Sequence, residues 1–252
     1  MRTVTVTRYV SPLREGGSLP AIVEADDDGM YVLKFRGAGQ GPRALVAELI
    51  AGELARAAGL PVPEIVFAEL DPVLARTEPD PEIQDLIRAS GGLNLAMDYL
   101  PGSLAFDPVV HTPATDLASR TVWFDAYVSN IDRTARNTNM LMWHGNLWLI
   151  DHGAALYMHH GGDPISPRAA ERFPMINNHV LLPWAGELEA ASKAMTEALT
   201  ASVIEQVIAR IPHAWLDDPD LRRQDYTKYL IDRLAEPQHF LEDALRARDA
   251  LV

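Results

Sequence analysis

Three oxygen-bearing side chains lie in a polar segment and in the apolar run after it. Asp132 and Asn137 belong to "SNIDRTARNTN" (129–139), and Asp151 ends the apolar run "LWLID". Carboxylate and amide oxygens are the hard ligands that Mg²⁺ prefers. Asp132 is a separate carboxylate that can accept a hydroxyl proton. These residue types indicate metal-assisted chemistry, and the alternative is that Asn130 and Asp132 are turn or capping residues.

A hairpin is expected to bring these side chains together. The apolar runs "NMLMWH" and "LWLID" flank Gly145–Asn146, a pair that suits a tight turn. With residues 145–146 as the turn, Met140 faces Asp151, and Asp151 returns to the end of the hairpin where Asn137 lies. An aspartate, an asparagine five residues later and a second aspartate after a hairpin form the layout of a protein-kinase catalytic loop.

Phosphoryl transfer also needs a cation on the nucleotide phosphates, oriented by a carboxylate. Lys34 is the only charge in the strand-like "YVLKF", and Glu48 lies in a stripe of small residues on the helix expected next. The loop "REGGS" contains Gly16, Gly17 and Ser18, whose backbone amides can approach phosphates. Each feature alone also suits a solvated charge or a plain turn. The order lysine, glutamate, aspartate, asparagine, aspartate along one chain is more specific than any of them.

The elements that position these residues divide into a strand-rich first part and a helix-rich second part. Alternation and β-branched residues predict the strands, and apolar periodicity with Gly and Pro boundaries predicts the helices. The expected strands are 3–10, 21–25, 30–35, 63–70, 93–100 and the hairpin, and the expected helices are 42–58, 81–89, 113–128, 185–210, 219–234 and 238–250. We therefore predict an α+β fold with an N-terminal nucleotide-binding lobe (1–100) and a mostly helical catalytic lobe (101–252).

The composition narrows the class of protein. The formal charge of −13 argues against general nucleic-acid binding, because a polyanion would be repelled. No apolar run approaches the roughly 18–20 residues that a membrane span needs, and the N-terminus lacks the apolar block of a signal peptide. The absence of cysteine excludes disulfides and a thiol nucleophile. A cytoplasmic protein is the simplest expectation.

Two longer stretches resemble a known family. "SNIDRTARNTNML" with "LWLIDHGAAL" resembles the catalytic segment of HipA-like kinases and is similar to that of type II phosphatidylinositol 4-kinases. "YVLKFRG" followed by "AELIAGELARAAGLPVPE" resembles the lysine strand and glutamate helix of the HipA pattern. The resemblance covers roughly residues 10–155 and is greatest to short, stand-alone domains of actinobacterial type. It implies a bilobal protein-kinase-like fold and ATP- and Mg²⁺-dependent phosphoryl transfer.

The resemblance also implies a role for each matching residue. Lys34 would hold the α- and β-phosphates and pair with Glu48, and Asp132 would be the catalytic aspartate. Mg²⁺ would be bound by Asn137 and Asp151. Adenine would meet the backbone of Met97, Asp98 and Tyr99. Two departures stand out: Ile131–Asp132–Arg133 replaces His–Arg–Asp, and "DHG" replaces "DFG". The first argues against a conventional protein substrate.

Other functions compete with a kinase. A non-catalytic nucleotide-binding pseudokinase that acts through a partner is the second class. A hydrolase with a histidine-bound metal is a weaker third, with the candidate ligands His152, His159, His160 and Asp163. Arg133 and Arg136 either meet an anionic substrate or are solvated loop charges. The acceptor, whether a protein, a lipid or a small molecule, is not specified by the sequence.

Overall fold

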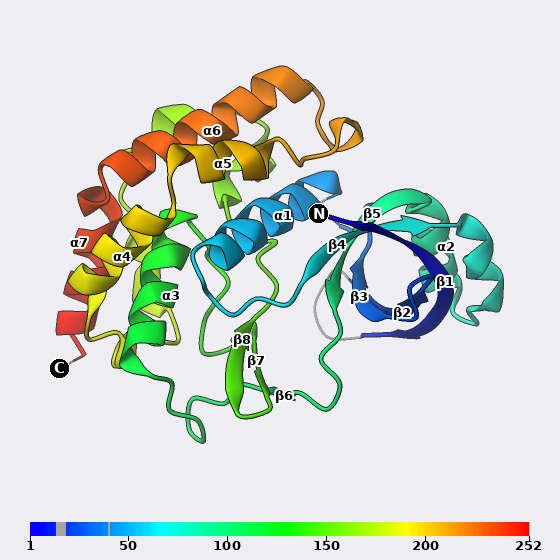
Figure 1. Ribbon diagram of the computed structural model, residues 1–252, viewed down its shortest axis with the longest axis horizontal. Helices are drawn as coiled ribbons and strands as arrows, with labels where there is room; N and C mark the ends of the chain where they lie inside the picture. The colour runs from blue at the N-terminus through cyan, green and yellow to red at the C-terminus, as the bar shows by residue number, and fades with distance from the viewer. Residues whose placement is uncertain (14–18, 40, 252) are drawn as a thin grey trace.

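The computed structural model describes residues 1–13, 19–39 and 41–251. A barrel of strands stands beside a larger helical part, with helix α1 (Pro42–Ala57) between them (Figure 1). The loop predicted to meet phosphates, with Gly16, Gly17 and Ser18, lies outside the described residues.

Five strands close into the barrel in the order β1-β2-β3-β5-β4. All neighbours are antiparallel except β1 and β4, which run parallel and close the barrel. Side chains alternate between its inside and outside, so that Tyr31 and Leu33 of β3 are buried in the barrel core. Lys34 therefore lies on the outer face, toward α1. The strands are β1 Thr3–Pro12, β2 Ala21–Ala25, β3 Met30–Lys34, β4 Ile65–Leu70 and β5 Gly92–Asp98.

Helix α1 packs closely against both parts of the molecule. It begins after Gly41, whose φ of 65° suits glycine, with Pro42 at its first turn. Gly52 allows the helix to approach β4, because a Cβ there would lie 2.4 Å from the Cδ1 atom of Ile65. The apolar side chains of α1 belong to the core that also contains the C-terminal helices. The division of the chain at residue 100 thus stays a prediction, since this core joins both sides of it.

The helical part follows β5 and includes a small three-stranded sheet, β6-β7-β8. Its strands are β6 Leu104–Ala105, β7 Met140–Trp143 and β8 Asn146–Leu149. The remaining α-helices are α2 Pro81–Ala89 beside the barrel, α3 Thr115–Tyr127, α4 Leu188–Ala198, α5 Ala201–Ile208, α6 Pro219–Ala235 and α7 Gln238–Asp249. Short 3-10 helices are η1 Pro72–Thr77, η2 Tyr157–Gly161, η3 Ser166–Arg168, η4 Pro174–Asn178, η5 Leu182–Trp184 and η6 His213–Trp215.

Two local predictions are wrong. The single helix expected over 185–210 is two helices, because Thr200 starts a new one: its hydroxyl accepts from the Val203 amide at 3.3 Å. The hairpin turn is also displaced by one residue. Trp143 pairs with Asn146, so the turn is 144–145, and both of its residues have positive φ, 48° and 78°. Met140 consequently faces Leu149 and not Asp151.

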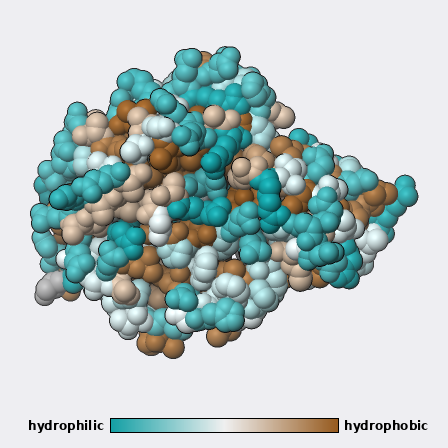
Figure 2. Space-filling model, in the orientation of Figure 1, coloured by the Kyte–Doolittle hydropathy of each residue, from teal (hydrophilic) through white to brown (hydrophobic). Residues whose placement is uncertain are grey.

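The surface seen in Figure 2 is largely hydrophilic, with hydrophobic side chains in separate small areas. Within the described part of the chain, none of the helices has the length and apolar character required to span a bilayer.

Candidate active site

A cleft of about 370 Å³ brings together the five polar residues singled out in the sequence. One wall comes from the barrel and α1, and the other comes from the loop after α3 and the segment after β8. Apolar side chains, among them Phe35, Leu45 and Ile131, form part of both walls. The polar lining residues are these five, Lys34, Glu48, Asp132, Asn137 and Asp151, together with Tyr157 and His160.

Lys34 is held between two carboxylates. Its Nζ lies 2.5 Å from Oε2 of Glu48 and 2.6 Å from Oδ1 of Asp151. Burial alone would lower the pKa of Lys34, but the charges of Asp151 and Glu48 outweigh it and raise that pKa above its ordinary value. The ammonium group is therefore charged at neutral pH, and the predicted contact between Lys34 and Glu48 is present.

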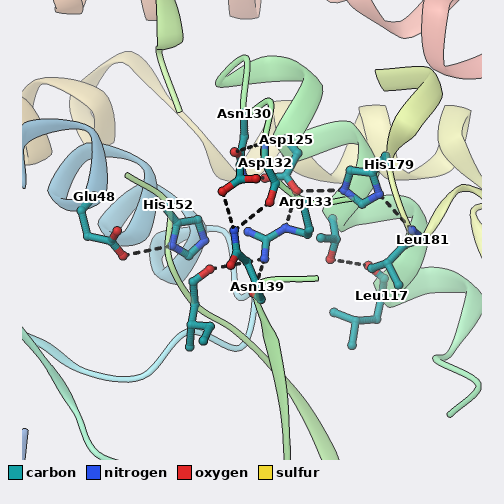
Figure 3. A network of polar contacts seen from close by, with 12 residues as sticks. Glu48, Leu117, Asp125, Asn130, Asp132, Arg133, Asn139, His152, His179 and Leu181 are labelled. Atoms are coloured by element: carbon teal, nitrogen blue, oxygen red, sulfur yellow. Dashed lines mark hydrogen bonds and ion pairs between the residues drawn. The ribbon is translucent and has the colours of Figure 1, made fainter. Parts of the chain in front are cut away.

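Glu48 is the buried member of this group, with only 1 % of its side chain exposed. Burial would raise its pKa, but Lys34 and then His152 outweigh that and lower it. His152 Nδ1 lies 3.6 Å from Oε1 of Glu48 (Figure 3). The glutamate thus stays ionised, which fixes α1 to the strand that carries the lysine.

Asp132 is oriented by two asparagines. Its Oδ2 accepts from Nδ2 of Asn137 at 2.8 Å and from Nδ2 of Asn139 at 3.3 Å. Asn139 Nδ2 also donates to the Asp132 backbone carbonyl at 2.7 Å. Burial raises the pKa of the Asp132 carboxyl despite the Asn139 contact, and the charge of Asp151 adds to the rise. The result is a fixed carboxylate that is a stronger base than an exposed aspartate.

The loop that carries Asp132 is anchored on a buried carboxylate in α3. Asp125 accepts from Nδ2 of Asn130 at 3.0 Å, from Nε of Arg133 at 2.5 Å and from Nε2 of His179 at 2.9 Å (Figure 3). Burial would raise the pKa of Asp125, but Arg133 and His179 outweigh it and hold the pKa below its usual range. Sequence reasoning missed this anchor, although Asp125 is the single charge in the apolar run "TVWFDAYV".

Arg133 differs from both expectations for it. It neither faces a substrate nor lies in solvent, because only 1 % of its surface is exposed. Its local sequence is polar, yet the buried Asp125 draws the guanidinium inward. Arg136, the other arginine of the loop, is exposed.

The residues assigned to adenine lie apart from the cleft lining. The Asp98 amide donates to the Glu64 carbonyl at 2.8 Å, and the Tyr99 amide donates to the Met30 carbonyl at 3.0 Å. Met97 lines a small gap together with Lys34 and Leu95. Their contact with adenine stays a prediction.

Four non-glycine residues in or beside the segments that form the cleft have left-handed backbone. They are Ser129, Asn139, Asp151 and Leu156, with φ of 53°, 48°, 54° and 51°. This conformation is costly for residues with a Cβ and tends to occur where function requires it. Here it lies at the end of α3 and beside the polar side chains of the cleft.

The side-chain oxygens of Asn137 and Asp151 suit a small divalent ion as ligands. Asn137 donates through Nδ2 to Asp132, which leaves its Oδ1 available as a ligand, and the Asp151 side chain is 45 % exposed toward the cleft. Mg²⁺ takes few protein oxygens and completes its shell with water and phosphate. The histidine-metal alternative has no site: among the described residues, no three His, Cys, Asp or Glu side chains gather as a metal-binding group.

Comparison with solved structures supports the predicted fold. A search of curated proteins finds no match. The proinflammatory kinase CtkA of Helicobacter pylori has a TM-score of 0.59 at 12 % identity, covering 99 % of both chains. A Golgi casein kinase with Mn and ADP bound has a TM-score of 0.58 at 12 % identity, covering 96 % of this chain and 74 % of the other. These likenesses confirm the predicted protein-kinase-like fold, with a β-barrel N-lobe and a helical C-lobe.

The sequence itself matches a protein family over most of its length. The profile described as "HipA-like kinase" covers residues 6–238. This match includes the lysine strand, the glutamate helix, the Asp132 loop and the segment that follows β8. The chain belongs to the HipA-like kinase family.

Proposed function

We propose that the protein is an ATP- and Mg²⁺-dependent phosphotransferase that moves the γ-phosphoryl group of ATP to a hydroxyl acceptor. The observation that carries the proposal is the convergence of Lys34, its two carboxylate partners and the Asp132–Asn137 pair on one cleft. Family membership supports ATP as the donor. The Mn and ADP in the Golgi casein kinase structure support a metal–nucleotide complex as the ligand of this fold.

Each residue has one task in this proposal. Lys34 binds the α- and β-phosphates, and Glu48 keeps it aimed at them. Asn137 and Asp151 hold Mg²⁺, which neutralises charge on the phosphates when it is bound. Asp151 contacts Lys34 in the structure, so binding of the metal by Asp151 and of the phosphates by Lys34 would replace this contact. The loop 16–18 and the backbone of 97–99 would contact the phosphates and adenine.

Asp132 acts on the acceptor. Its carboxylate orients the acceptor hydroxyl and takes its proton. The acceptor oxygen bonds to the γ-phosphorus as the bond from that phosphorus to the β–γ bridging oxygen breaks, and ADP leaves with the electron pair. Positioning and charge stabilisation supply most of the acceleration in such reactions. The raised pKa of Asp132 makes it a better proton acceptor than an ordinary aspartate.

Asp132→Asn tests the proposal, because it keeps the shape of the side chain and removes the proton acceptor. We expect ATP–Mg²⁺ affinity close to that of the wild type and turnover at least roughly 10²-fold lower. Calorimetric titration gives the affinity, and ADP release with protein, lipid and small-molecule hydroxyls gives the turnover. Asp116→Asn, on the exposed side of α3, is the matched control.

Two outcomes would reject the assignment. Full turnover by a folded Asp132→Asn protein would make Asp132 a structural turn residue. A wild type that binds ATP–Mg²⁺ but transfers nothing to any acceptor class would favour the pseudokinase alternative.

A further inference from the structure

We infer that Arg133 is a positioning residue that sets the spacing between the two metal-binding segments of the cleft. One segment carries Asn137 and the other carries Asp151. The inference rests on the proposed function to the extent that these two side chains bind a divalent ion.

A single guanidinium group joins the two segments. Arg133 Nη1 donates to the Asn139 carbonyl at 2.5 Å and lies 3.4 Å from the Ile150 carbonyl. Asn139 is two residues beyond Asn137, and Ile150 directly precedes Asp151. The Ile150 amide donates to the same Asn139 carbonyl at 3.0 Å. The arginine thus bridges the point at which the two segments meet, and Figure 3 shows its hydrogen bonds to Asp125 and Asn139.

The contacts fall where the backbone is strained. Asn139 and Asp151 both have left-handed φ, although neither is glycine. Such residues persist only where their surroundings fix them. Arg133 bonds the carbonyl of the first and approaches the carbonyl that precedes the second. Loss of these contacts would let either segment relax, and the ligand oxygens would move apart.

The guanidinium is itself held rigidly from the opposite side. Its Nε donates to Asp125, and Asp125 also accepts from Nε2 of His179. His179 Nδ1 accepts from the Leu181 amide at 3.0 Å, so its proton lies on Nε2, facing the aspartate. The Arg133 carbonyl accepts from the Val180 amide at 3.0 Å. A planar, multiply bonded arginine in a fixed place can act as a spacer, which a lysine cannot reproduce.

Mn²⁺ binding in the presence of ADP provides a readout other than activity. Free Mn²⁺ is followed by electron paramagnetic resonance during titration of the wild type and of Arg133→Lys. This variant keeps a positive charge beside Asp125 but loses the planar, multiple N–H donors of the guanidinium group. We expect Mn²⁺ affinity to fall about 10–100-fold, as for other residues that orient metal ligands. ADP affinity without metal should remain unchanged, because Arg133 does not line the cleft.

Arg233→Lys is the matched control. Arg233 is equally buried, at 1 % exposure, and its guanidinium also donates to backbone carbonyls, those of Ala126, Tyr127, Ala169 and Glu171. Its loss should lower the melting temperature by a comparable amount and leave Mn²⁺ affinity unchanged. Guanidinium ion, added well below denaturing concentrations, should restore part of the Mn²⁺ affinity of Arg133→Ala.

The results separate this inference from the proposed function. Arg133→Lys that loses stability like Arg233→Lys but binds Mn²⁺ like the wild type would overturn the positioning role. A wild type that binds Mn²⁺ and ADP without turnover would reject phosphoryl transfer, and the Mn²⁺ titration would still decide the role of Arg133. A wild type that binds no metal with nucleotide would overturn both.

Discussion

Replacing Lys34 by methionine removes the main cation from a buried carboxylate while keeping a side chain of similar length. Glu48 is 1 % exposed and would be left with the imidazole of His152, whose Nδ1 lies 3.6 Å away, as its nearest polar partner. Breaking a buried ion pair from one side costs about 3–5 kcal/mol, because the remaining charge is uncompensated. Lys34 is itself only 15 % exposed, so solvent screening reduces this little. We expect the free energy of unfolding at pH 7 to fall by about 3–5 kcal/mol.

The pH dependence identifies the cause. In the wild type, Lys34 and His152 hold the pKa of Glu48 below its ordinary value despite burial. The stabilisation is therefore present at neutral pH and is lost as the pH falls from the ordinary glutamate pKa toward the lower pKa of the folded protein. Without the lysine, burial should raise the pKa of Glu48 above its ordinary value. The folded variant then takes up a proton before the unfolded chain does. The difference in free energy of unfolding between the wild type and Lys34→Met should therefore become smaller as the pH falls from 7 toward about 5.

Urea unfolding followed by circular dichroism at both pH values measures this effect. The double variant Lys34→Met/Glu48→Gln is the control: it leaves no buried, unpaired carboxylate at position 48, so it should regain most of the lost stability and show no such pH dependence. A deficit of Lys34→Met below about 1 kcal/mol, equal at both pH values, would match an exposed ion pair and refute the reasoning. ADP release by the same variant should drop, since the phosphates lose their cation.

Further predictions concern the other residues of the cleft. Asp151→Asn should weaken nucleotide binding in the presence of Mg²⁺ but should not weaken metal-free binding, because it also frees Lys34 from Asp151, as calorimetry with and without a chelator would show. The acid limb of turnover should lie above the ordinary aspartate range, because Asp132 must be ionised and its pKa is raised by burial; a pH–rate profile tests this. For the same reason Asp132→Asn should be at least as stable as the wild type at pH 7 in urea unfolding, since ionising a carboxylate of raised pKa costs folding energy there. Gly52→Ala should cost about 1–3 kcal/mol through its clash with Ile65, and Ile65→Val should recover part of it.

Much of the fold could be predicted because its signals are local. Alternation in 21–25 and 30–34 both defines the strands and turns Lys34 away from the barrel core. The interval from Asp132 to Asn137 lies within one loop, and their hydrogen bond follows from that short separation. The hairpin was located correctly but its turn was not, since His144 adopts a positive φ that sequence reasoning reserves for glycine or asparagine.

The anchor of the loop that carries Asp132 could not be predicted, because its signals are not local. Its hydrogen bonds join residues far apart in the chain, as between Asp125 and His179. Arg133 stands in a polar segment and has the sequence surroundings of a surface charge, and only tertiary packing reveals its burial. The helix break before Thr200 depends on one capping hydroxyl within a periodic apolar pattern.

The charges of the cleft themselves argue for a cationic ligand. Three carboxylates, those of Glu48, Asp132 and Asp151, face a single lysine across this space. Burial is the main cause of the raised pKa of Asp132, and the negative charge of Asp151 adds to the rise. The left-handed backbone at Asp151 adds strain at the same place. Binding of a cation between these carboxylates would stabilise the folded protein. The arrangement therefore favours a divalent ion with its polyphosphate over a neutral ligand.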